Sequence, residues 1–378
     1  MDFDLSEEQR LLQDSVSRLL SDRYAFTARR NFSREPDGWS QDMWRQYGEL
    51  GLLGLPFDES VGGMGASGVE TMLVMEAFGR AAILEPYLAS VVLGGTAIKL
   101  AGSAAQKSAL LPGVADGSRK LAFAHGERQA RHDLTDVLTT AKKDSSGWIL
   151  EGAKSVVLHG DCADTLIVSA RTAGARDAAD GISLFIVDAN AEGMARRGYK
   201  LHDATQAAEI SLSSVRVPEN AVLGKIGEGL ATIQRVMEAG IAATAAEAVG
   251  AMEVLNTMTV EYLKTRVQFG KPIGENQVLQ HKAAEMLVEL EQGRSMAMLA
   301  AMMLEEPDAD ERARNMAMVK VHTGRCATFV AKTAVQLHGG IGMTEELAIA
   351  TYFRRIMVIE QLFGDTAYHL ARLGEQVA

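Results

Sequence analysis

Two stretches in the C-terminal half of the chain combine residue types that could bind a phosphate group. Arg266-Val-Gln-Phe269-Gly270 closes a long helical segment, and Gln336-Leu-His-Gly339-Gly340 joins another helical segment to a turn. A guanidinium offers phosphate a planar fork of donors, and glycines let backbone N–H groups approach an anion closely. The same residue types also form ordinary helix ends, where Arg caps the last carbonyls and Gly stops the helix. Composition alone favours the helix-end interpretation and leaves the phosphate site open.

A third glycine motif, Gly63-Met-Gly65-Ala-Ser-Gly68, matches the G-x-G-x-x-G pattern of dinucleotide-binding loops. Its context differs from theirs, because Pro56 interrupts the preceding run and no strand–helix–strand unit follows. We interpret the motif as a glycine-rich connection between helices. The eight histidines show no metal-ligand spacing and no G-x-S-x-G elbow occurs. The sequence therefore predicts neither a zinc or iron site nor a serine hydrolase.

The composition argues against several other classes of protein. The 378 residues include 38 basic and 49 acidic side chains, a net charge of −11, and 47% are hydrophobic. A sizeable core is expected, whereas a nucleic-acid groove or an anionic-membrane surface would need basic patches. Cys162 and Cys326 lie far apart and predict two buried thiols in a reducing compartment. The chain starts without a secretory signal pattern, and its longest apolar run, 88–98, is shorter than the roughly 20 residues that span a bilayer. We expect a cytoplasmic protein.

The elements that must position the two phosphate-binding stretches change in character twice along the chain. Residues 1–118 are predicted to be helical, with a capping-box pattern at Ser6 and Gln9. Residues 119–225 hold short β-like runs, and residues 226–378 return to helix. The runs are Leu121–Ala124, Trp148–Leu150, Ser155–Leu158, Thr165–Val168 and Ile182–Val187. Strands without long helices between them favour a sandwich or barrel. We therefore predict an α+β protein with three domains: an N-terminal α-helical domain, a middle β-barrel or sandwich domain, and a C-terminal helical bundle.

Four ordered motifs make the chain resemble the acyl-CoA dehydrogenase family over essentially its whole length. They are Gly51-Leu-Leu-Gly-Leu with Gly62-Gly-Met-Gly65, Val215-Arg-Val-Pro218, Tyr262 to Ile273 around the Arg266 stretch, and Gln336 to Gly342. The resemblance implies that family's fold, with a C-terminal four-helix bundle, and FAD as cofactor. It also implies α,β-dehydrogenation of an acyl-CoA thioester, electron transfer to an electron-transfer flavoprotein, and assembly as a homotetramer or heterotetramer. The opening Asp2-Phe-Asp-Leu-Ser-Glu-Glu-Gln9 and the run Leu158-His-Gly-Asp161 look most similar to the small subunit of pimeloyl-CoA dehydrogenase.

The resemblance further implies which residues bind FAD. Two strand segments would line the flavin, with side chains from Phe123, Ala124, His125, Val157, Leu158 and His159. Arg266 and Phe269 would reach the adenosine diphosphate part of a neighbouring subunit's FAD. Gln336, Gly339 and Gly340 would complete that site.

The base that the reaction needs is missing from its usual places. Removing hydrogens from both carbons of a thioester requires a carboxylate for the α proton as well as a flavin for the hydride. Family members place a Glu at one of two positions, which hold Gly240 and Phe363 in this chain, or Gln361 if the alignment has a gap. Carboxylates close to these positions are Glu238, Glu247, Glu360 and Asp365. We predict that Glu238, Glu360 or Asp365, one at most, is a displaced base, although each also fits a solvated or structural charge.

Three hypotheses about function remain open from the sequence. The chain is an active FAD-dependent acyl-CoA dehydrogenase with a displaced base, a subunit of a heteromeric dehydrogenase whose partner supplies the base, or a flavin monooxygenase on the same fold. The resemblance suggests a dicarboxylyl-CoA such as pimeloyl-CoA, or a bulky acyl-CoA such as a steroid derivative. His125, His132 and His159 are candidates for recognising a distal carboxylate.

Overall fold

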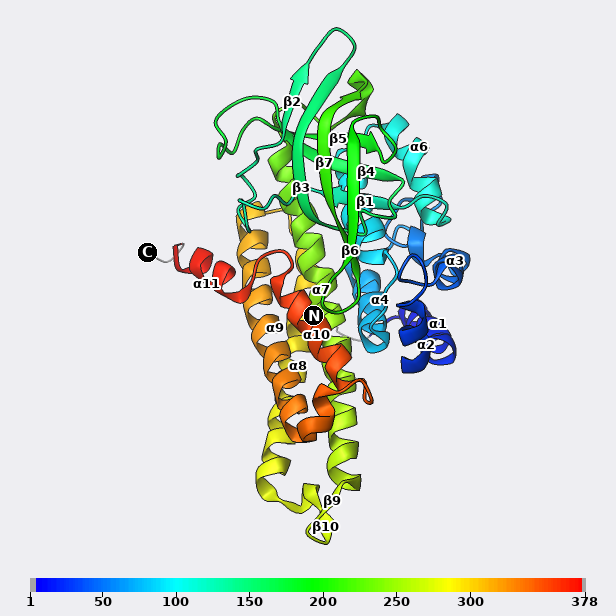
Figure 1. Ribbon diagram of the computed structural model, residues 1–378, viewed down its shortest axis with the longest axis vertical. Helices are drawn as coiled ribbons and strands as arrows, with labels where there is room; N and C mark the ends of the chain where they lie inside the picture. The colour runs from blue at the N-terminus through cyan, green and yellow to red at the C-terminus, as the bar shows by residue number, and fades with distance from the viewer. Residues whose placement is uncertain (1–4, 376–378) are drawn as a thin grey trace. The chain divides into compact units, whose positions relative to one another are not determined.

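The computed structural model describes residues 5–375, which fold into two units (Figure 1). The bundle unit comprises the described residues up to Asn31, Ser67–Ile83, and the chain from Ile241 onward. The sheet unit comprises Phe32–Ala66 and Leu84–Gly240. The division falls inside one long helix, α7 (Gly229–Thr265). Residues 2–4 of the opening motif lie outside the described residues.

The sheet unit is built on an eight-stranded sheet in the order β6-β7-β3-β2-β4-β5-β8, with β1 paired to β4. β1 and β2 run parallel to β4, and the other neighbours are antiparallel. Aliphatic and aromatic side chains such as Leu150, Leu166 and Phe185 form its buried core. The strands are β1 (Leu121–Ala124), β2 (Thr140–Lys143), β3 (Trp148–Leu158), β4 (Thr165–Arg171), β5 (Ile182–Asp188), β6 (Met194–Lys200), β7 (Gln206–Val217) and β8 (Val222–Leu223).

Two runs that the sequence predicts as separate strands, 148–150 and 155–158, belong to the single strand β3. The register between β3 and β7 shifts between Lys154 and Val157, and Val156 between them has a φ of 52°. Such a β-bulge adds a residue to one strand and turns the local direction of its side chains. The strand therefore continues through a point where the apolar alternation breaks.

Helices complete the sheet unit and hold the glycine motif. They are α3 (Gln41–Glu49), η1 (Leu52–Gly54), η2 (Glu59–Val61), η3 (Leu88–Gly95), α5 (Thr96–Ala101), α6 (Ala104–Ala115) and η4 (Glu219–Ala221). Gly63 follows η2, and a Cβ there would lie 2.0 Å from the carbonyl oxygen of Phe57. The motif is a glycine-rich connection between helical segments, as predicted, because a side chain at Gly63 would collide with backbone.

In the bundle unit, α9 contacts α8, α10 and α11, and α4 contacts α1 and α8 (Figure 1). The capping box predicted at Ser6 and Gln9 is confirmed at the start of α1. A Cβ at Gly79 of α4 would lie 2.0 Å from the Glu247 carbonyl oxygen of α7, so these two helices touch through their backbones. The elements are α1 (Glu7–Arg23), the start of α2 (Phe26–Phe32), α4 (Gly68–Ala81), α7 from Ile241, β9 (Val267–Gln268), β10 (Lys271–Pro272), η5 (Ile273–Glu275), α8 (Gln277–Met303), α9 (Ala309–His338), η6 (Gly339–Met343), α10 (Ile349–Gln361) and α11 (Thr366–Glu375).

Among the described residues, no helix has both the length and the apolar character that a membrane crossing requires.

Candidate active site

The two stretches with phosphate-binding residue types come together at one end of the bundle unit. Tyr262, near the end of α7, stacks on His338, the last residue of α9, with ring centroids 4.4 Å apart. Arg266 follows Tyr262 by about one helical turn, and Gly339 follows His338 directly. The sequence placed these stretches far apart, and the stacked pair explains how the fold unites them.

This end of the bundle fits an anionic group. The side chain of Arg266 is exposed and forms no ion pair within the described part of the chain. A Cβ at Gly339 or Gly340 would meet no atom within 4 Å, so a ligand could approach their backbone. Phe269 is fully exposed (101%) with a φ of 51°, on the turn of the β9–β10 hairpin. Gln336 is also exposed. A free guanidinium beside accessible glycine backbone is a donor set that suits a diphosphate.

The residues that the resemblance assigns to the flavin fall on two neighbouring segments of the sheet unit. Phe123 and Ala124 end β1, and His125 follows; Val157 and Leu158 end β3, and His159 follows. The N–H of Ser155 donates to the Gly126 carbonyl at 2.8 Å, which links the two segments. All six side chains are buried except that of Leu158, which is half-buried. The sheet therefore brings the two predicted segments side by side.

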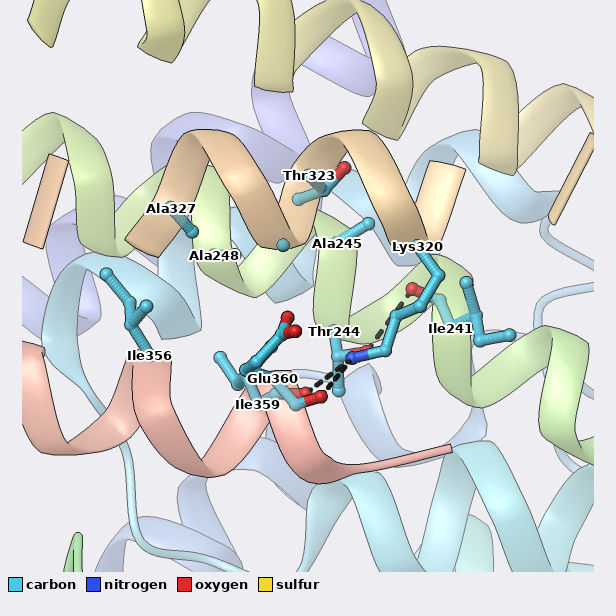
Figure 2. A pocket seen from close by; sticks show the side chains of 11 residues that line it. Ile241, Thr244, Ala245, Ala248, Lys320, Thr323, Ala327, Ile356, Ile359 and Glu360 are labelled. Atoms are coloured by element: carbon cyan, nitrogen blue, oxygen red, sulfur yellow. Dashed lines mark hydrogen bonds between the residues drawn. The ribbon is translucent and has the colours of Figure 1, made fainter. Parts of the chain in front are cut away.

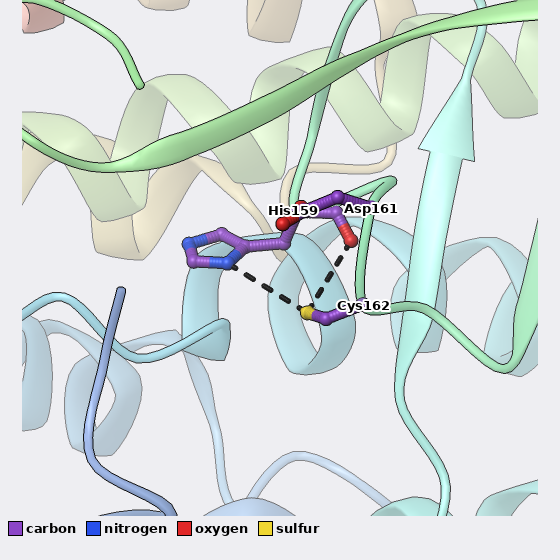
Figure 3. A group of neighbouring side chains, drawn as sticks. All are labelled: His159, Asp161 and Cys162. Atoms are coloured by element: carbon purple, nitrogen blue, oxygen red, sulfur yellow. Dashed lines mark hydrogen bonds between the residues drawn. The ribbon is translucent and has the colours of Figure 1, made fainter. Parts of the chain in front are cut away.

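One group of side chains in the sheet unit has the residue types of a metal site: His159, Asp161 and Cys162 (Figure 3). The Cys162 sulfur lies 4.0 Å from His159 Nδ1, and the three ligand atoms lie within 4.8 Å of one another. Ligands of a tetrahedral zinc stand about 3.5 Å apart and normally number four in a structural site. Burial raises the pKa of the Cys162 thiol to about 12, which keeps it protonated. The histidine spacing in the sequence predicts no metal site. The fold brings His159 and Cys162 together, but this turn lacks the geometry of a zinc centre.

Three helices of the bundle unit enclose a small, mostly apolar pocket (Figure 2). Its lining residues are Ile241, Thr244, Ala245 and Ala248 of α7, Lys320, Thr323, Gly324 and Ala327 of α9, and Ile356, Ile359 and Glu360 of α10. Figure 2 shows the Glu360 carboxylate pointing from α10 into the space between the helices. The pocket therefore combines an apolar wall with one carboxylate and one ammonium group.

Glu360 is held by one oxygen and leaves the other unpartnered. Its Oε1 accepts a hydrogen bond from the Thr366 N–H at 2.9 Å, at the start of α11. Its Oε2 is buried and has no hydrogen-bond partner among the residues that the structure describes. A Cβ at Gly324 would lie 2.3 Å from Oε2, so the carboxylate occupies space that only a glycine on α9 leaves free. A buried carboxylate oxygen with an open hydrogen-bonding position is the arrangement that a general base requires.

Lys320 faces the same pocket and fixes the end of α10. Its Nζ donates to the carbonyl oxygens of Ile359 at 2.7 Å and Glu360 at 3.1 Å. Burial lowers the pKa of Lys320 to about 8, and the negative charges of Glu360 and Asp365 partly oppose that shift. The cation satisfies the last carbonyls of the helix.

The other carboxylates predicted from the sequence have partners. Glu238 of the sheet unit is buried, and its Oε2 lies 3.7 Å from Nε of the half-buried Arg235. Asp365 accepts the Tyr368 N–H at 2.8 Å and thereby caps the first turn of α11. Glu247 forms a bidentate ion pair with Arg355, at 2.6 and 2.7 Å. Of these four carboxylates, Glu360 alone lines the bundle pocket, and its Oε2 has no partner in the described part of the chain.

Comparison with known proteins decides the family. Models of the N-terminal, middle and C-terminal domains of acyl-CoA dehydrogenases match residues 6–118, 122–215 and 227–378. Acyl-CoA dehydrogenase FadE12 of Mycobacterium tuberculosis is 31% identical over 350 residues, which cover 91% of this chain and 89% of FadE12. This chain belongs to the acyl-CoA dehydrogenase family. Members of that family are oxidoreductases that act on a CH–CH bond of an acyl-CoA.

Solved structures of the acyl-CoA dehydrogenase family agree with the fold. Butyryl-CoA dehydrogenase from Megasphaera elsdenii superposes with a TM-score of 0.91 at 27% identity, over 100% of both chains. A variant of the Tcur3481-Tcur3483 steroid ACAD gives 0.88 at 29% identity, over 98% of both chains. The predicted fold class, a helical N-terminal domain, a middle sheet domain and a C-terminal helical domain, is confirmed. The similarity to a pimeloyl-CoA dehydrogenase subunit stays a prediction.

Lys320, which holds the end of α10, is a pocket residue that the sequence did not single out. The signal was available, because Met316, Lys320, Thr323 and Ala327 recur at helical spacing on the buried side of α9. A charged residue inside an apolar stripe predicts a partner across the interface. What the stripe does not reveal is that the partners are the carbonyls that end α10.

Proposed function

We propose that this chain catalyses the FAD-dependent α,β-dehydrogenation of an acyl-CoA thioester, with Glu360 as the base that takes the α proton. Membership of the family supports the reaction class. The observation that carries the assignment of the base is the buried, unpartnered Oε2 of Glu360 in the bundle pocket. The candidates Glu238 and Asp365 remain as alternatives to be tested beside it.

The bundle pocket suits proton abstraction from carbon. The Thr366 N–H at the start of α11 holds Oε1 of Glu360, and Lys320 donates to the carbonyls that end α10, so the position of the carboxylate in the pocket is fixed. Ile241, Ala245 and Ile356 give the pocket walls that exclude water. The α proton would be received at Oε2, while Oε1 keeps its hydrogen bond and holds the side chain in place.

Each of the two units has residues that would hold part of FAD. In the bundle unit, Arg266 with the backbone of Gly339 and Gly340 would bind the diphosphate, and Phe269 and Gln336 would border it. In the sheet unit, the two segments 123–125 and 157–159 would face the ring system. FAD supplies the acceptor for the hydride from the β carbon. The family resemblance further suggests an electron-transfer flavoprotein as the electron acceptor and an oligomer in which sites are shared.

Single-turnover reduction identifies the base. The FAD-loaded chain is mixed anaerobically with an acyl-CoA thioester, and flavin bleaching is followed in Glu360→Gln, Glu238→Gln and Asp365→Asn variants. Glu360→Gln should abolish bleaching while the other two retain it. If Glu360→Gln bleaches as fast as the wild type, the pocket carboxylate is not the base.

A second function is favoured by the residues at the two usual positions of the catalytic Glu. Gly240 has no side chain, and Phe363 is held with a φ of 60° while its carbonyl lies 2.9 Å from His369 Nε2. Neither residue accepts a proton. This chain would then be one subunit of a heteromeric dehydrogenase whose partner brings the Glu. Bleaching that requires a paralogous subunit with an intact Glu, and survives Glu360→Gln, would establish this alternative.

The acyl group is the least defined part of the proposal. The pimeloyl-like motifs favour a dicarboxylyl-CoA, and the related steroid ACAD favours a bulky acyl group. Comparison of pimeloyl-, butyryl- and steroid-side-chain-CoA in the same titration ranks these classes directly.

A further inference from the structure

Four polar side chains are buried together in the sheet unit, where burial is costly unless every group is paired. His125 follows β1, Glu127 follows it by two residues, Lys154 lies in β3 and Ser169 lies in β4. Their exposed fractions are 7%, 5%, 1% and 0%. Apolar packing does not explain a lysine and a glutamate here, so the hydrogen bonds of the group must account for their burial.

Lys154 and Glu127 form an ion pair in which every charged donor has an acceptor. Lys154 Nζ donates to Glu127 Oε1 at 2.7 Å, to Ser169 Oγ at 2.9 Å and to the His125 carbonyl at 3.2 Å. Three acceptors match the three protons of an ammonium group. Glu127 also accepts the backbone N–H groups of Leu138 at 2.8 Å and Thr139 at 3.1 Å. Burial raises the pKa of Glu127, but Lys154 and the hydrogen bonds from Thr139 and Gln129 bring it down to about 2.

Ser169 connects the Lys154–Glu127 ion pair to the ring of His125. Ser169 Oγ lies 2.9 Å from His125 Nδ1 and already accepts a hydrogen bond from Lys154 Nζ. If Nδ1 carried a proton, the hydroxyl proton of the fully buried serine would have no acceptor, which costs about 1–3 kcal/mol. Ser169 therefore donates to Nδ1, and the proton of the neutral imidazole resides on Nε2.

The surroundings also keep the imidazole neutral. Burial, together with the positive charge of Lys154, lowers the pKa of His125 to about 3, against the opposing influence of Glu127 and Asp133. Nε2 has no hydrogen-bond partner within the described part of the chain, and His125 keeps a small exposed fraction. One N–H donor of fixed direction thus remains for a group outside the network.

We propose that Glu127, Lys154 and Ser169 are positioning residues that hold His125 as a neutral Nε2–H donor for an electron-rich atom of the bound ligand. Only the nature of that ligand rests on the proposed function, under which the acceptor is an oxygen or nitrogen of the isoalloxazine ring. The tautomer and its supporting network follow from the contacts of the chain itself. A buried ion pair is therefore retained because it orients one hydrogen-bond donor, not because it stabilises the sheet.

The tautomer is tested by ¹⁵N NMR of the full chain labelled at histidine, with the His125 signals assigned by their loss in His125→Gln. The expected signature is a neutral ring protonated at Nε2 and unchanged from pH 7 to pH 5. Ser169→Ala and Lys154→Met should alter it. Ser183→Ala, at an equally buried serine of the same sheet, should not. A ring protonated at Nδ1, or one that titrates in this range, overturns the proposal.

The ligand is tested separately by FAD binding to His125→Gln and His125→Phe. Gln retains an N–H donor, so it should bind FAD nearly as the wild type does. Phe should weaken binding about two- to ten-fold, the range of one neutral hydrogen bond. If both variants bind FAD equally well, the flavin is not the acceptor of the His125 hydrogen bond. A wild-type chain that takes up no FAD would instead contradict the proposed function, while the NMR result would still decide the network.

Discussion

Replacing Arg355 by Met is the perturbation whose cost follows most directly from the contacts. Arg355 of α10 and Glu247 of α7 form a bidentate pair at 2.6 and 2.7 Å, with side chains only 7% and 2% exposed. These two helices line the bundle pocket. The pair therefore joins two walls of the candidate active site, and Glu247 is assigned a structural role.

The expected cost comes from the charge that the substitution leaves behind. Arg355→Met keeps the apolar stem but leaves the Glu247 carboxylate buried without its partner, which costs about 3–5 kcal/mol. Removing both charges in Glu247→Leu/Arg355→Met eliminates that penalty, so the free energy of unfolding should fall much less in the double variant. A larger loss of unfolding free energy in the single variant than in the double variant would identify the unpartnered Glu247 charge as the cause.

Urea unfolding followed by circular dichroism measures these differences in the wild type, the single variant and the double variant. Arg45→Met serves as the control, because Arg45 pairs with Asp42 and Glu49 on an exposed helix face with its own side chain 60% exposed. The control should unfold at nearly the wild-type urea concentration. An Arg355→Met variant as stable as the Arg45→Met control would refute the assignment of Glu247 as a buried structural anion.

Three further outcomes are expected. Gly324→Ala should displace Glu360 and slow flavin bleaching, because the new Cβ would lie 2.3 Å from Oε2. The control Gly374→Ala, with open space around the new Cβ, should not slow it. Equal bleaching rates in the two variants would contradict the pocket geometry. Arg266→Ala should weaken FAD binding by about 10- to 150-fold, the equivalent of about 1.5–3 kcal/mol for a charge-assisted contact, as measured by equilibrium dialysis, and unchanged binding would exclude Arg266 from the cofactor site. Between pH 8 and 10, the free energy of unfolding of the wild type should rise relative to that of Lys320→Met, by at most about 1.4 kcal/mol per pH unit. The reason is that Lys320 keeps its proton in the unfolded chain after the folded chain has lost it. Parallel pH profiles of the two proteins would refute the low pKa of Lys320.

The sequence predicted the fold class well, and its errors have physical causes. Short apolar runs located β1, β4 and β5, whose residues are almost all buried. The edge strand β6, Met194–Lys200, went unrecognised because its exposed face carries Arg and Lys and its apolar signal is weak. Charged side chains on an edge strand discourage pairing with other chains, and they also mask the strand pattern.

The candidate site was less predictable, because its chemistry depends on contacts between distant elements. The sequence named Glu360 as one of three carboxylates but could not rank them. The ranking came from the Thr366 N–H of α11, the bare Gly324 of α9 and the partners of the competing carboxylates, which are Arg235 for Glu238 and the Tyr368 N–H for Asp365. Likewise, His125 was expected beside the flavin by resemblance, whereas its tautomer depends on Lys154 and Ser169 of two other strands.

Anaerobic titration of the isolated chain, loaded with FAD, against an acyl-CoA thioester tests the central proposal most directly. The chain should bind FAD stoichiometrically, and its flavin absorbance should bleach as the thioester is added without any second protein present. A chain that stays colourless after incubation with FAD, or a bound flavin that no acyl-CoA reduces, would contradict the proposal that this protein is by itself a dehydrogenase.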